Sequence, residues 1–140
     1  MKKIKGQGLI EMLLIFLFIG ISVVAILRFQ NYLAYSTNLT QQQSDANLIA
    51  ASQIETLRNY SVLNTTSGYT AYQGIANGTS STTVGNTTYS VSWTVTTFTN
   101  PNYKVIDVTV TWTDRYGASQ SINLATRIGS IDPSASARFI

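Results

Sequence analysis

The sequence contains no cysteine and no histidine among its 140 residues. Such a chain has neither a thiol nucleophile nor the usual general base, and it forms no disulfide. Metalloprotease, redox, P-loop and dinucleotide-binding motifs are absent as well. The lack of cysteine does not identify a compartment, because proteins outside the cytoplasm also fold without disulfides. We therefore expect no enzyme, no cofactor and no metal site, and a domain that is stabilised by packing.

Charged residues are also scarce. Nine Lys and Arg residues stand against six Asp and Glu, which gives a formal charge of +3. Lys2, Lys3 and Lys5 supply that excess, so the chain from Gln7 onward is neutral and no nucleic-acid partner is expected. Asp107 and Asp114 are the only carboxylates of the C-terminal half that could converge. An outward strand position and a turn explain them better than a glycosidase-like pair.

A long apolar run dominates the N-terminal part of the chain. From Met12 to Leu27 there is no charge, and the run follows a basic leader that should stay on the cytoplasmic side. Roughly 18–20 such residues cross a hydrocarbon core. A secretory signal would be shorter and would end in small residues, so a membrane anchor fits better. The apolar side chains expected in the membrane are Leu9, Ile10, Leu13, Leu14, Phe16, Leu17, Phe18, Ile19, Val23, Val24, Ile26 and Leu27.

One carboxylate, Glu11, lies near the start of this run. An ionised side chain inside a membrane helix is costly, by about 2.5–3.5 kcal/mol at the bilayer centre on insertion scales. Two interpretations remain open for Glu11. Its carboxylate either reaches the interface, or it pairs with a positive partner.

The N-terminal pattern resembles the class III signal of type IV pilins and pseudopilins: a Lys-rich leader ending at Gly6, then Gln7, Gly8, an apolar pair, Glu11 and an unbroken apolar helix. The resemblance implies that prepilin peptidase cuts between Gly6 and Gln7 and methylates the new amine of Gln7. It also implies that Glu11 pairs with the N-terminal ammonium of a neighbouring subunit in a fibre, where each charge neutralises the other. The family usually has Phe at the position of Gln7.

The helix is expected to continue beyond the apolar run, from about Ile10 to Tyr60, because residues 28–60 contain neither Pro nor Gly. Thr37, Asn38 and Thr40 are its weakest part and predict a bend or local break. One apolar stripe recurs at helical spacing: Leu39, Ala46, Ile49, Ala50, Gln53, Ile54 and Leu57. The polar face of the helix, opposite this stripe, includes Asp45, Ser52, Glu55 and Arg58. We expect the stripe to pack on a sheet of the same domain.

Alternation of apolar and polar residues predicts three strands, at about 88–98, 103–113 and 119–129. The inward positions are Tyr89, Val91, Trp93 and Val95, then Ile106, Val108, Val110 and Trp112, then Ile122, Leu124 and Ile128. Turns of hairpin length are expected at 99–102 and 114–117. The predicted fold class is α+β: a long N-terminal helix packed by its second half on an antiparallel sheet of about three strands.

These predictions divide the chain into six parts. They are a leader (1–6), a membrane and assembly helix (7–28), the second half of the helix as the spine of a head (29–60), a Ser/Thr/Asn-rich loop (61–87), a β-meander (88–129) and a C-terminal tail (130–140). Within the loop, Tyr69, Tyr72 and Ile75 are expected to pack on the domain at intervals.

Residues 51–58, and 108–114 followed by Gly117, look like minor pilins of the PilV-like group. The resemblance implies a structural minor pilin of a type IV pilus, single-pass in the inner membrane with its C-terminus outside before assembly. Its implied partners are other pilin subunits, prepilin peptidase and the inner-membrane assembly platform. Two alternatives stay open: a pseudopilin of a type II secretion system, and a membrane-anchored module whose Tyr-rich loops bind a carbohydrate or surface ligand.

Overall fold

The computed structural model describes residues 7–133, which form one helix and four strands. Helix α1 spans Gln7–Arg58 and is followed by β1 (Gly78–Val84), β2 (Thr87–Thr99), β3 (Asn102–Thr113) and β4 (Ser119–Gly129). The chain divides into two compact units at Thr40. The first unit holds the N-terminal part of α1, and the second holds the rest of α1 with the sheet. We call the second unit the head.

The helix ends at Arg58, two residues before the expected end, and the predicted break is absent. Thr37, Asn38 and Thr40 are all helical. The Thr40 hydroxyl donates to the carbonyl oxygen of Ser36 at 2.9 Å, so its polar group is satisfied inside the helix. Weak helix propensity at three positions is a small cost when both flanking segments are helical, which is why the prediction of a local break was wrong. The alternative of a bend stays a prediction.

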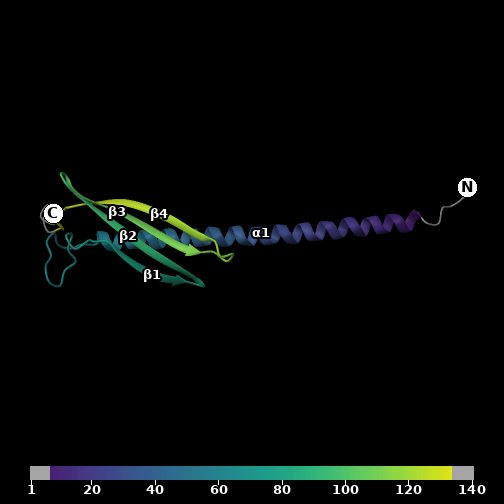
Figure 1. Ribbon diagram of the computed structural model, residues 1–140, viewed down its shortest axis with the longest axis horizontal. Coiled ribbons are helices and arrows are strands. Elements are labelled where there is room, and N and C mark those ends of the chain that lie inside the picture. Colours follow the sequence, from purple (N-terminus) through teal and green to yellow (C-terminus); the bar gives the residue numbers. More distant parts are fainter. Residues whose placement is uncertain (1–6, 134–140) are drawn as a thin grey trace, which may run out of the picture. The chain divides into compact units, whose positions relative to one another are not determined.

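The sheet is a four-stranded antiparallel meander in the order β1-β2-β3-β4, and Figure 1 shows its strands side by side along the C-terminal part of α1. Three of the strands match the expected ones, and the α+β fold class is confirmed. The expected turns join them: Thr99 pairs with Asn102, and Thr113 pairs with Ser119.

Strand β1 lies inside the segment that was predicted to be loop, and that prediction was wrong. Its residues from Thr79 to Val84 are all exposed, so it has no apolar face to alternate with a polar one. It is held by pairing with β2 through the tight turn at Gly85 and Asn86, which Val84 and Thr87 flank as a pair. Gly85 has a φ of 59°, a conformation that glycine adopts without a Cβ penalty and that suits the first central position of a hairpin turn.

The core of the head lies between the sheet and the predicted stripe of α1. Ala46, Ala50 and Ile54 are its buried helix residues, and the small side chain of alanine lets the sheet approach the helix closely. The facing strand residues are Tyr89, Val91, Ile106, Val108, Val110, Trp112 and Ile128. Side chains of this size contribute about 1.5–3 kcal/mol each when fully buried. The predicted inward faces of the strands are therefore confirmed.

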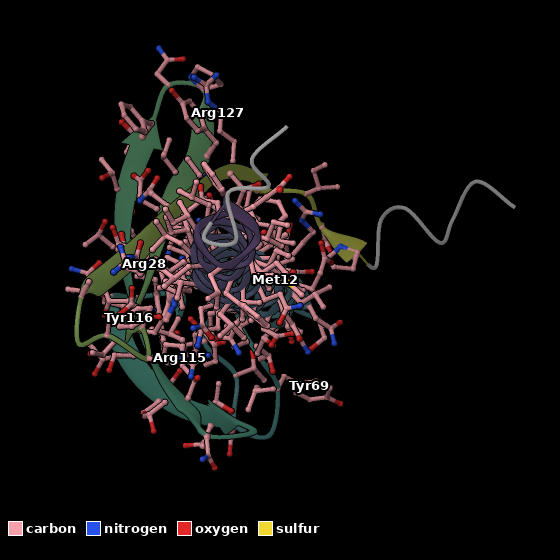
Figure 2. All side chains as sticks on the ribbon, turned by 90° about the vertical axis from the view of Figure 1, so that its right-hand side faces the viewer. Met12, Arg28, Tyr69, Arg115, Tyr116 and Arg127 are labelled. Atoms are coloured by element: carbon pink, nitrogen blue, oxygen red, sulfur yellow. The ribbon has the colours of Figure 1, made fainter. Side chains whose placement is uncertain are left out.

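The segment between α1 and β1 packs on the head without regular structure. Its chain folds back on itself through a parallel bridge between Val62 and Ala71. Tyr72 and Ile75 are buried as expected, whereas Tyr69 is 62% exposed, so its predicted packing was wrong. Figure 2 shows Tyr69 projecting outward. Tyr69 therefore does not anchor this segment to the domain. Backbone pairing around Val62 holds it instead.

The start of the predicted C-terminal tail is held against the end of the helix segment. The Tyr60 hydroxyl donates toward the carbonyl oxygens of Gly129 and Ile131, at 2.8 and 2.9 Å, and accepts from the Ile131 amide at 3.1 Å. The predicted leader (1–6) and residues 134–140 lie outside the described residues.

Candidate functional site

The apolar segment of α1 is uncovered on every side within the described part of the chain. Exposed fractions of its large side chains run from 48% at Leu14 to 74% at Leu9. Figure 2 shows side chains projecting around the whole circumference of the helix, with Met12 labelled. A helix that is apolar all round is stable only when other apolar groups surround it. By length and composition this helix could cross a membrane.

Polar groups of this segment are few, and one of them is satisfied locally. The Ser22 hydroxyl donates to the carbonyl oxygen of Phe18 at 2.8 Å. A hydroxyl bonded to its own helix backbone costs little in an apolar surrounding, because no donor is left unpaired. Ser22 is therefore compatible with burial among lipid chains or other helices.

Glu11 lies in the second turn of α1, and its side chain is exposed. Among the described residues, the salt bridge of Glu55 with Arg58 is the one ion pair found, and Glu11 takes no part in it. Gln7 is the first helical residue, and Gly6 lies outside the described range. The structure thus places Glu11 on the same helix as all twelve predicted membrane residues, while the cleavage site stays a prediction.

A buried cation in the head was missed by sequence reasoning. Lys104 on β3 is only 5% exposed, and its Nζ donates to the carbonyl oxygens of Tyr72, Gln73 and Ile75 at 2.9, 3.3 and 2.7 Å. Nζ also lies 5.0 Å from the centroid of the Tyr72 ring, in cation–π range. Burial lowers the pKa of Lys104, because desolvation disfavours the charged ammonium.

The signal for Lys104 was present in the strand alternation. It lies two residues before Ile106, so it belongs to the inward face of β3 that continues through Val108. A lysine at an inward position indicates a buried partner, and here three main-chain carbonyls of the preceding segment fill that role. No local pattern identifies those carbonyls, since they come from residues about thirty positions earlier.

Asp107 and Asp114 lie in different structural settings. Asp107 is half-buried at an outward position of β3, as expected. Asp114 is buried, and its Oδ1 accepts from the amides of Tyr116 and Ala118, both at 2.9 Å, so the carboxylate organises the β3–β4 turn. No group of three or more acidic side chains that could hold a metal occurs within the residues described.

Comparison with models of known protein families, with curated proteins and with solved structures gave no match.

Proposed function

We propose that this chain is a structural minor pilin of a type IV pilus. The observation that carries the proposal is the uncovered apolar segment from Leu9 to Leu27, with one carboxylate near its start, on the same helix that forms the spine of a small α+β head. The N-terminal resemblance to the class III signal supports it. The precursor is held in the inner membrane, single-pass, with its head outside.

In this proposal, prepilin peptidase cuts between Gly6 and Gln7, and the new amine of Gln7 is methylated. The carboxylate of Glu11 then pairs with that ammonium on a neighbouring subunit as the assembly platform moves the helix from lipid into the fibre. Both environments are apolar, so the transfer exchanges one apolar surrounding for another. Each charge is costly there unless the other neutralises it.

Cohesion of the fibre comes mainly from the apolar side chains. Burial contributes about 25 cal/mol per Å², so packing of side chains from Leu9 to Leu27 far outweighs one ion pair. The pair of Glu11 and the ammonium therefore sets the axial register between subunits. The head, which packs around its own core, stays at the outside of the fibre.

The deciding experiment is the N-terminal mass of the protein from cells with and without prepilin peptidase. The proposal expects a mature chain that begins at methylated Gln7, and an uncut precursor in the peptidase-negative cells. An intact leader in both cells refutes it and leaves a plain anchored domain. Recovery of the mature chain from sheared extracellular fibres distinguishes a pilus from a periplasmic pseudopilus of type II secretion.

A further inference from the structure

The head contains a pocket of about 460 Å³, within the size range of small-molecule sites. We call it the Lys104 pocket. It is lined by Leu63, Asn64, Tyr72, Gln73, Thr97, Asn102, Lys104 and Ser130. These residues come from the segment before β1, from the ends of β2 and β3, and from the residue after β4. All of them belong to the head.

The floor of this pocket carries a positive charge with no counter-ion. Lys104 is 5% exposed, and all three of its ammonium protons are directed at main-chain carbonyls. No lining residue is acidic, and in the described part of the chain no carboxylate forms an ion pair with Lys104. Carbonyl dipoles solvate the ammonium without neutralising it. The pocket therefore has a positive potential that favours an anion.

The rim of the pocket is made of neutral hydrogen-bonding groups. Gln73 Nε2 donates to Asn64 Oδ1 at 3.0 Å, which orients the two amides against each other. The side-chain Nδ2 of Asn64 and the side-chain Oε1 of Gln73 then have no partner among the described residues. Asn102, Thr97 and Ser130 add an amide and two hydroxyls. Such paired donors and acceptors match the hydroxyl groups of a sugar.

Apolar surface completes the lining. Tyr72 is 3% exposed and Leu63 is half-buried, so both are held firmly by the head. Lys104 Nζ lies over the Tyr72 ring, so Leu63 is the side chain that offers apolar surface to the C–H face of a pyranose, while the rim matches its edge. The set of cation, amides and aliphatic surface is that of a site for a ligand with a carboxylate and several hydroxyls.

We propose that the Lys104 pocket binds a sugar acid, with the carboxylate directed toward Lys104 and the hydroxyls on the Asn64, Gln73 and Asn102 amides. Lys104 acts through its field, since its protons stay on the carbonyls, and the amides make the direct contacts. This binding is independent of fibre assembly, and it assigns the head a recognition role in addition to the structural one.

The test is an NMR titration of the full ¹⁵N-labelled chain in neutral detergent micelles with three probes. Sodium glucuronate carries both the carboxylate and the hydroxyls, glucose only the hydroxyls, and acetate only the charge. We expect saturable shifts of the Asn64, Gln73 and Asn102 side-chain amides with glucuronate. Glucose and acetate should each bind at least about tenfold more weakly, because each lacks half of the recognised chemistry. Equal affinity for glucose, or no saturable shift with glucuronate, overturns the proposal.

A substitution on the rim of the pocket tests the site without changing the buried Lys104. Asn102→Asp adds a negative charge at an exposed position of the pocket and removes one of the amides that contact the hydroxyls, so it should weaken glucuronate binding at least about fivefold more than it weakens glucose binding. Gln43→Glu adds the same charge at an exposed position of α1 and should leave glucuronate affinity unchanged. Equal effects of the two variants, or none from Asn102→Asp, refute the site. Because the titration uses unassembled protein, its outcome does not depend on whether the pilin proposal holds.

Discussion

The indole of Trp112 on β3 donates a hydrogen bond from Nε1 to Oε1 of Gln42 on α1, at 3.1 Å. Nε2 of the same amide donates to the Thr87 hydroxyl on β2, also at 3.1 Å. One side chain therefore joins the helix to two strands at the edge of the core. It satisfies the one polar group of a tryptophan that is 3% exposed.

Replacement of this amide tests its role. Gln42→Ala should lower the free energy of unfolding by about 1–3 kcal/mol, because it leaves the Trp112 N–H buried without an acceptor. Urea denaturation followed by tryptophan fluorescence measures the change. Gln43→Ala, one position along and exposed, is the matched control and should change stability by less than about 0.5 kcal/mol. Equal effects of the two substitutions contradict the assignment.

Lys104→Met should destabilise the head by about 2–3 kcal/mol, because the carbonyls of Tyr72, Gln73 and Ile75 lose their donor. The loss of stability should be greatest in the segment around Tyr72 and Gln73. Hydrogen exchange of the Tyr72 and Gln73 amides, which donate to Val62 and Leu63, should accelerate before that of the strands.

Arg115→Met removes an exposed positive charge from the β3–β4 turn and serves as the control for charge alone. It should leave both the stability and the exchange of these amides near their original values. If Lys104→Met behaves in the same way, the buried ammonium does not hold the segment.

Gly78→Ala should destabilise the head by about 1–3 kcal/mol through overpacking. A Cβ at this position would lie 2.8 Å from Cε2 of Trp93 and closer still to Cζ2, because the indole lies over the glycine of the paired strand. The ring is fixed there, since its Nε1 donates to the Ala76 carbonyl at 2.9 Å. Near-UV circular dichroism and urea denaturation report the change.

A double-mutant cycle isolates this contact. In a Trp93→Ala background, Gly78→Ala should cost less than about 0.5 kcal/mol, because the ring that it would strike is gone. Ser80→Ala in the same exposed strand controls for the general effect of alanine. An undiminished cost in the Trp93→Ala background shows that the strain arises elsewhere.

Because the Tyr89 side chain is buried, we expect the free energy of unfolding to fall at alkaline pH. Burial, with a smaller contribution from Asp45, raises the pKa of Tyr89 above its ordinary value of 10.0. The folded state therefore holds the phenolic proton more tightly than the unfolded state. Its stabilising contribution is complete below pH 10 and is lost as pH rises from 10 toward the folded-state pKa. Burial likewise raises the pKa of Tyr72.

Lys104 acts in the opposite direction, because its pKa is lowered in the folded state and its contribution grows as pH rises toward 10.5. Comparison of the original chain with Tyr89→Phe at each pH cancels this effect. The difference in unfolding free energy between the two should be constant up to pH 10 and should then shift in favour of Tyr89→Phe. Urea denaturation between about pH 8 and 11.5 measures it, and parallel curves across the range contradict the prediction.

Glu11→Ala tests the assembly step of the proposed function. The head should keep its stability, because Glu11 lies outside the unit that holds the core. Incorporation into fibres should fall at least about tenfold, since the ammonium of the neighbouring subunit loses its counter-ion in an apolar surrounding. Immunoblots of sheared fibres measure incorporation. Glu55→Ala removes an exposed carboxylate from the same helix and should leave incorporation unchanged.

Much of the fold follows from local patterns. The long helix, the stripe containing Ala46 and Ala50, and three strands could be predicted because each has a period that buries one face. Strand β1 could not be predicted in this way, since Thr79 to Val84 have no buried face and are held by backbone pairing, with one hydroxyl–hydroxyl hydrogen bond between Thr83 and Thr88. The Gly85-Asn86 turn was its only local signal.

The sequence by itself determined which parts of the chain must leave water: the segment from Leu9 to Leu27 and the inward faces of the helix and strands. It also placed the single carboxylate, Glu11, beside the apolar run. Only the tertiary structure decided where Lys104 finds its three carbonyls, and that these groups line a pocket with Asn64 and Asn102. The physical reason is the separation along the chain of the residues that interact. Apolar periodicity is a property of neighbours in the chain, whereas the partner of a buried charge is selected by which distant segments the packed core brings together.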